Sequence, residues 1–141
     1  MYIKALIACV AGVSATLAVA AGQDYPFVDK SSPALIDEAT ARAVADELMT
    51  ERMAKLYPPR AWGFATQVLG GFTATGTCVV TARVMLLPRN NPRPTRSLLF
   101  KPERMAMAFD ALPNATVENC RALAKNKLAE AMRAVESGPV H

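Results

Sequence analysis

Residues 73–86 read TATGTCVVTARVML, and in this stretch polar and apolar side chains alternate. Alternation with a period of two is typical of a β-strand with one buried face. Threonines occupy most of the odd-numbered positions, whereas the even-numbered positions, including Cys78, are small or apolar. We therefore predict a long amphipathic strand that turns Cys78 toward the core.

Apolar runs on both sides of this stretch predict further strands. Residues 62–69 form one such run, and Gly70 and Gly71 after it predict a tight turn into the long strand. Residues 98–109 predict at least one more strand, which Pro102 interrupts or places at a sheet edge.

The first helix is predicted before the strands. Ser32 is a suitable N-cap, and Pro33 suits the first helical position. Apolar residues at helical spacing continue to Tyr57, where Pro58 and Pro59 stop the pattern. We expect one unbroken helix from this start to Tyr57.

A closing helix is predicted after Pro113, with Asn114 or Thr116 as its cap and Gly138 at its end. Its apolar stripe comprises Val117, Cys120, Leu123, Ala124, Leu128, Ala131 and Val135.

These elements predict an α+β fold in which a helix, three or four antiparallel strands and a second helix form a two-layer sandwich. Both helices are expected on the sheet face that carries Cys78. Two separate periodicities turn Cys78 and Cys120 toward the same interior, so we predict a helix-to-sheet disulfide. It closes a loop of 120 − 78 = 42 residues, which contributes about 4 kcal/mol in the chain-entropy model.

The N-terminus resembles a secretory signal. Lys4 precedes a small and apolar run that ends in an Ala-Val-Ala triplet at residues 18–20. We expect residues 1–20 to be a signal peptide, 21–32 a tether, 33–137 one domain and 138–141 a tail. Cys9 then leaves with the signal, and the mature chain is periplasmic or secreted; a retained membrane anchor is the alternative.

Composition argues against several functional classes. The net charge is +4, too small to indicate a nucleic-acid partner. The only histidine, His141, is the last residue, and with the cysteines paired no catalytic or zinc-binding set of residues is evident. We therefore expect neither an enzyme nor a cofactor.

The candidate contact residues are basic and aromatic. Arg89, Arg93 and Arg96 lie in the proline-rich segment 88–96, which is expected to be an exposed loop able to receive carboxylates or phosphates. Arg83 extends this patch, and Trp62 is a candidate anchor for a partner. The methionines are interpreted mostly as core filler.

The order of these features resembles the C-terminal domain of TolA, a periplasmic component of the Tol-Pal envelope system, and more distantly that of TonB. The likeness lies in the helix that ends Leu56-Tyr57-Pro58, in the strand at residues 76–84, and in the helix start at residues 119–124. In that family a strand cysteine and a helix cysteine are bridged. The resemblance implies an envelope module that binds protein, accepting a strand at a sheet edge.

Three functional hypotheses follow. The first is a non-enzymatic exported module that binds another envelope or secreted protein through a sheet edge or the 88–96 loop. The second is an inhibitor or immunity protein that inserts this basic loop into the acidic cleft of a secreted hydrolase. The third is a small enzyme, which requires Glu103 and Asp110 to approach Arg83.

Overall fold

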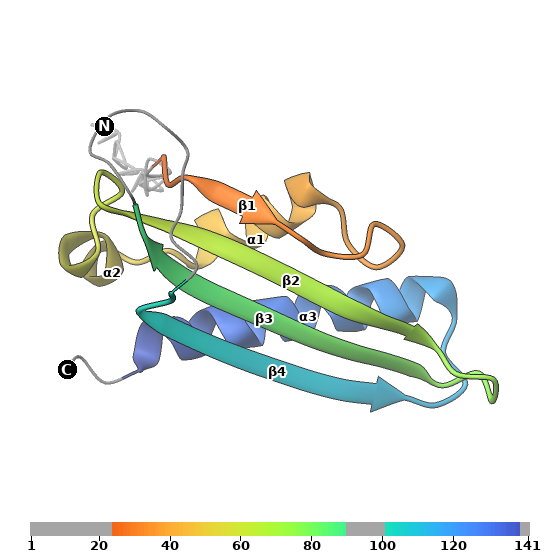
Figure 1. Ribbon diagram of the computed structural model, residues 1–141. Coiled ribbons are helices and arrows are strands. Elements are labelled where there is room, and N and C mark those ends of the chain that lie inside the picture. Colours follow the sequence, from red (N-terminus) through yellow and green to blue (C-terminus); the bar gives the residue numbers. More distant parts are fainter. Residues whose placement is uncertain (1–23, 90–100, 139–141) are drawn as a thin grey trace, which may run out of the picture.

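A four-stranded sheet and three helices make up the part of the chain that the computed structural model describes, residues 24–89 and 101–138 (Figure 1). In chain order the elements are β1 (Phe27–Asp29), α1 (Glu38–Leu48), α2 (Glu51–Leu56), β2 (Trp62–Phe72), β3 (Cys78–Pro88), β4 (Arg104–Leu112) and α3 (Val117–Ser137).

The strands lie in the order β1-β2-β3-β4. The pairs β2–β3 and β3–β4 are antiparallel, as predicted. β1 runs parallel to β2, with Phe27 opposite Phe64, so the sheet is mixed and the prediction of a wholly antiparallel sheet is wrong at this strand.

Long-range polar contacts hold β1 in the segment that we expected to be a tether. The carboxylate of Asp29 accepts hydrogen bonds from Ser31 Oγ at 2.6 Å and Thr66 Oγ1 at 2.7 Å. Ser31 Oγ in turn accepts a hydrogen bond from the N–H of Val68 at 2.8 Å. A strand of three residues has too few positions to show a period, so the sequence pattern did not reveal it.

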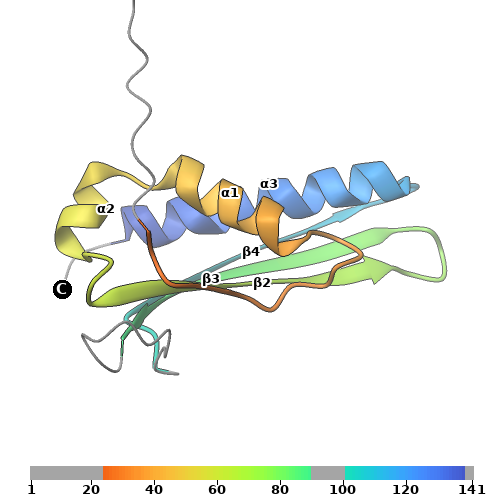
Figure 2. The ribbon, with the colours of Figure 1, turned by 90° about the horizontal axis from the view of Figure 1, so that it is seen from above.

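The helices cover one face of the sheet only (Figure 2). The alternation predicted for β3 is confirmed, because its even-numbered residues Cys78, Val80, Ala82, Val84 and Leu86 are all fully buried. Buried residues of α3, including Ala124, Leu128 and Met132, belong to the same hydrophobic cluster. The core therefore lies between α3, α1 and the helix-facing side of the sheet.

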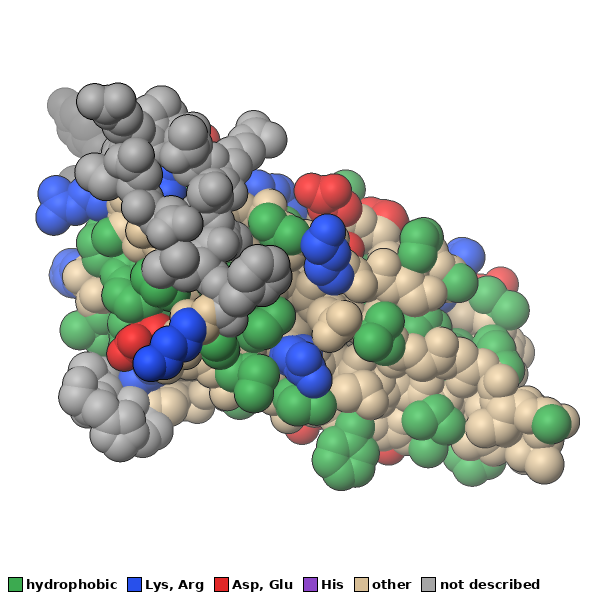
Figure 3. All heavy atoms as spheres, viewed as in Figure 1, with side chains coloured by type: hydrophobic (Ala, Val, Ile, Leu, Met, Phe, Trp, Pro, Cys, Tyr) green, Lys and Arg blue, Asp and Glu red, His purple; other side chains and the backbone are tan. Residues whose placement is uncertain are grey.

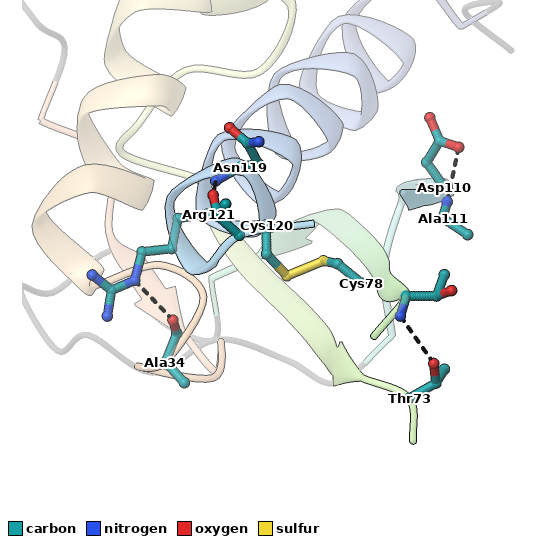
Figure 4. The surroundings of a disulfide bond; sticks show 10 residues. Ala34, Thr73, Cys78, Asp110, Ala111, Asn119, Cys120 and Arg121 are labelled. Carbon is teal, nitrogen blue, oxygen red and sulfur yellow. Dashed lines mark hydrogen bonds between the residues drawn. A yellow bond between two sulfur atoms is a disulfide. The ribbon is translucent and has the colours of Figure 1, made fainter. Parts of the chain in front are cut away.

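The predicted disulfide joins these layers. Cys78 at the start of β3 and Cys120 in the first turn of α3 are bonded, with their Cα atoms 5.7 Å apart (Figure 4). Both side chains are essentially inaccessible to solvent. Next to the bridge, Arg121 Nε donates a hydrogen bond to the carbonyl of Ala34 at 3.1 Å, which fastens the segment before α1 to α3.

The first helix is broken where we expected it to be continuous. α1 begins at Glu38 with Asp37 as N-cap, not at Pro33, and it ends at Leu48 because Met49 adopts an extended conformation. Thr50 then caps α2, its hydroxyl oxygen accepting the N–H of Met53. A threonine followed by an acidic residue is a helix-start signal, and it overrides the continuous apolar stripe.

The turn between β2 and β3 lies further along than predicted. Gly70 and Gly71 continue β2 with φ of +144° and +152°. The chain reverses at residues 73–77, where the N–H of Thr73 donates to the carbonyl of Thr77 at 2.8 Å and Gly76 adopts φ +77°. The stretch predicted to be strand from residue 73 is therefore strand only from Cys78.

Candidate protein-binding surface

The face of the sheet that points away from the helices carries several large, exposed apolar side chains. Pleating places every second residue of each strand on this face, which we call the open face. Its most exposed members are Leu69, Val79, Met105, Met107 and Phe109. Phe109 is 79% exposed, Met105 53% and Met107 49%. An exposed row of large apolar side chains along a strand marks an interaction surface more often than isolated exposed residues do.

Arg83 lies in the middle of the open face. The register places it between Gln67 of β2 and Met107 of β4. Its Nε is buried and has no hydrogen-bond partner in the described part of the chain. A buried donor of a charged group without an acceptor costs free energy, and that cost is removed when an acceptor arrives.

Acidic side chains are absent from the open-face positions of β2, β3 and β4. Figure 3 looks onto this side of the molecule, where hydrophobic side chains stand among other polar side chains and backbone, with a few basic groups, and acidic ones lie toward the margins. The described open face thus combines apolar area with positive charge, which favours a contact that brings its own carboxylate.

Asp110 lies near the C-terminal end of β4, the strand at one edge of the described sheet. Its carboxylate accepts the N–H of Ala111 at 2.8 Å and lies 3.3 Å from the ammonium group of Lys127. These two contacts, the Ala111 hydrogen bond first, hold the pKa of Asp110 below its usual range. Asp110 is therefore ionised at neutral pH, and its carboxylate occupies the N–H of Ala111 at this end of β4.

The structure separates the predicted contact residues. Arg83 lies on the open face, whereas Arg89 Nη1 donates to the carbonyl of Pro59 at 3.0 Å and so contributes to the packing at the end of the sheet. Trp62 is half-buried, with its ring edge-on to Tyr57 at 5.1 Å between centroids. Arg93 and Arg96 lie outside the described residues, as does most of the predicted loop at 88–96.

The three residues considered for an enzyme are not brought together. Glu103 and Asp110 flank most of β4, seven residues apart, which is roughly 23 Å along a strand. Asp110 points to the helix side of the sheet and Arg83 to the open side. Residues 24–89 and 101–138 also contain no cluster of three or more histidine, cysteine or acidic side chains that could hold a metal ion. Within the same residues, no helix is long and apolar enough to cross a membrane.

Sequence reasoning missed the row Met105, Met107 and Phe109, because methionines were interpreted as core filler. A signal was present. These three residues recur at a period of two between alanines, a pattern that places all of them on one face of a strand. Alanine on the other face is small enough to lie under α3, so the larger side chains point away from the core.

Comparison with known proteins gives no family. No family model matches the chain, and no curated protein matches it. Among solved structures it is similar to PelC from a Paraburkholderia phytofirmans dodecamer, with 10% identity, a TM-score of 0.42, and coverage of 86% of this chain and 93% of that one. It is also similar to a candidate lipoprotein from Caulobacter crescentus CB15, with 15% identity, a TM-score of 0.38, and coverage of 77% and 84%.

Proposed function

We propose that this chain is an exported, non-enzymatic protein-binding module of the cell envelope, and that its contact surface is the open face of the sheet. The disulfide between Cys78 and Cys120 supports export, because such bonds persist in oxidising compartments and are rare in the cytosol. The observation that carries the binding role is the apolar, acid-free open face with the unpartnered Nε of Arg83 in its middle.

The chemistry of this surface defines the partner. Met105, Met107 and Phe109 offer apolar contact area, and methionine in particular adapts its shape to different side chains. A guanidinium group recognises a carboxylate in a directional way, and it is strongest when the contact excludes water. The partner segment is therefore an apolar stretch of an envelope or secreted protein with an aspartate, a glutamate or a C-terminal carboxylate that reaches Arg83.

Site-specific cross-linking tests this function. A photoreactive phenylalanine analogue is placed at position 109 in the chain produced in its own cell, and at Arg133, on the exposed outer side of α3, as the control. We expect a discrete adduct with one other protein from position 109 and none from position 133. No adduct at 109, or the same adducts at both positions, contradicts the proposed contact surface.

Binding of this chain to the purified partner that the cross-link identifies then tests which side chains make the contact. Replacing one central anchor of an interface typically weakens binding by about tenfold or more. We expect Arg83→Glu and Phe109→Asp each to do so, and Arg133→Glu to leave binding unchanged. An acid-to-lysine change in the partner that restores binding to the Arg83→Glu variant identifies the carboxylate. If Arg83→Glu binds as the original chain does, the open face is not the contact surface.

A further inference from the structure

β4 is the long free edge of the described sheet. It pairs only with β3, and the opposite edge is β1, a strand of three residues that follows Pro26. Natural proteins shield sheet edges with short strands, prolines or charges. β1 has these features, whereas residues 105–109 of β4 contain neither proline nor charge. The β4 edge is thus able to take another strand.

Backbone hydrogen bonds show which groups of β2 face each neighbour. The N–H groups of Lys30 and Ser32 donate to the carbonyls of Thr66 and Val68 at 2.9 and 2.8 Å. Even-numbered residues of β2 therefore turn their peptide groups to β1, and odd-numbered residues turn theirs to β3.

The same alternation continues across the sheet. Odd-numbered residues of β2 pair with odd-numbered residues of β3, so the even-numbered residues of β3 bond to β4. These pair with even-numbered residues of β4, as in Ala82 opposite Ala108. The odd-numbered residues Met105, Met107 and Phe109 therefore direct their N–H and C=O groups outward, to the free edge.

The backbone groups of β4 that point to the free edge end at equal distances before and after Met107. Four positions before it, the N–H of Glu103 is turned inward to the carbonyl of Leu86 at 2.8 Å. Four positions after it, the N–H of Ala111 is satisfied by Asp110 at 2.8 Å. The backbone groups available for pairing are thus centred on Met107.

The side chains of β4 are complementary to themselves about the same centre. Residues 104–110 read RMAMAFD. When two copies lie antiparallel with Met107 opposite Met107, the positions of Arg104 and Asp110 are opposed. Within each copy Arg104 donates to the carbonyls of Val135 and Gly138 at 2.9 and 2.7 Å, and Asp110 lies 3.3 Å from Lys127, so this opposition only avoids like charges and adds no ion pair. Met105 then lies opposite Phe109, and alanine lies opposite alanine. Sulfur–aromatic pairs stabilise cross-strand neighbours, and no like charges are opposed.

We propose that β4 pairs with β4 of a second copy of this chain, antiparallel about a two-fold axis at Met107, so that two four-stranded sheets become one. Each of the three opposed outward pairs exchanges two backbone hydrogen bonds. The interface is isologous, as most homodimer interfaces are. This inference goes beyond the proposed function, since the edge forms the dimer and the open faces of both copies stay available for a different protein.

Thiol cross-linking at the axis tests the pairing in the full oxidised chain. Directly opposed residues of a hydrogen-bonded pair have Cα atoms about 5.5 Å apart, within the range for a disulfide. We expect Met107→Cys to give a covalent dimer under mild oxidation, and Met105→Cys or Phe109→Cys alone to give none. The double change Met105→Cys with Phe109→Cys should cross-link again. Equal cross-linking at all three single positions overturns the register.

Solution mass provides the second test. Sedimentation of the unmodified chain should give twice the monomer mass. Met107→Pro removes one outward N–H without touching the ladder to β3, so it should give a monomer that keeps a cooperative thermal transition. A monomeric mass for the unmodified chain at concentrations up to its solubility limit overturns the dimer. Cross-linking to a different protein from position 109 would then still stand, so the two proposals fail separately.

Discussion

The hydroxyl of Tyr25 donates a hydrogen bond of 2.6 Å to the backbone carbonyl of Tyr57. Tyr25 is buried just before β1, and its ring packs edge-on against Phe64 of β2. Tyr57 is the C-cap of α2. This contact joins the segment that we expected to be a loose tether to the end of the helical layer, so the folded domain begins before residue 33.

Burial raises the pKa of Tyr25 to about 12, which predicts a loss of stability in alkali. Below about pH 10 the tyrosine is protonated in both the folded and the unfolded chain. Between about pH 10 and 12 the unfolded chain releases this proton and the folded chain keeps it, so the free energy of unfolding falls as the pH rises. Chemical denaturation at a series of pH values measures this fall.

The Tyr25→Phe variant isolates this contribution from other groups that titrate in alkali. It should be less stable than the original chain at pH 7 by about 1 kcal/mol, because the carbonyl of Tyr57 loses its donor. The gap between the two proteins should narrow from pH 10 to 12. A constant gap across this range would show that Tyr25 titrates normally.

The disulfide should account for much of the stability of the domain. Reduction, or the double change of Cys78 and Cys120 to alanine, removes the constraint on a 42-residue separation. We expect the free energy of unfolding to fall by about 2–5 kcal/mol. Denaturation with and without reductant measures it. The double variant is the control, because reductant should not alter its stability. A reductant effect of similar size on that variant would disprove the assignment.

Gly70 should be the less replaceable of the two adjacent glycines in β2. A Cβ at Gly70 would lie 1.9 Å from the carbonyl oxygen of Val79, whereas a Cβ at Gly71 would meet nothing within 4 Å. Both residues have positive φ, so alanine at either position costs about 1–3 kcal/mol in backbone strain. Gly70→Ala adds the clash with the neighbouring strand. The melting temperature of Gly70→Ala should therefore be lower than that of Gly71→Ala. Equal falls in melting temperature would contradict the close approach of Gly70 to the carbonyl oxygen of Val79.

The parts of the fold that were predicted correctly are those with long periodic patterns. β3 and α3 each present many residues at one period, so most of their buried faces, and with them the Cys78–Cys120 bridge, follow from the sequence. The predicted stripe of α3 is wrong at Val117, which is 50% exposed at the start of the helix. The misplaced turn at Gly70 shows the limit of residue type as evidence. A glycine permits positive φ in a strand as readily as in a turn, and here Gly70 and Gly71 stay paired with Val80 and Val79 of β3.

The candidate site was less predictable than the fold. Arg83 was selected as part of a basic loop surface, yet its position between Gln67 and Met107 depends on the register of three strands. The open edge of β4 depends on which strand ends the sheet, and that order is a tertiary property. Only the period of Met105, Met107 and Phe109 was visible in the sequence.

Thr50 joins the break between α1 and α2 to the end of α3, so replacing its hydroxyl should lower the stability of the domain. Its Oγ1 accepts the N–H of Met53 at 3.3 Å and donates to Glu136 Oε1 at 2.6 Å. Thr50→Val keeps the shape of the side chain but removes both bonds, so it should lower the free energy of unfolding by about 1–2 kcal/mol. Thr50→Ser keeps the hydroxyl and should lose much less. Chemical denaturation of the two variants compares them directly. Equal losses would mean that the methyl group of Thr50 contributes as much as its hydroxyl, which contradicts the prediction that the two hydrogen bonds hold the helix break in place.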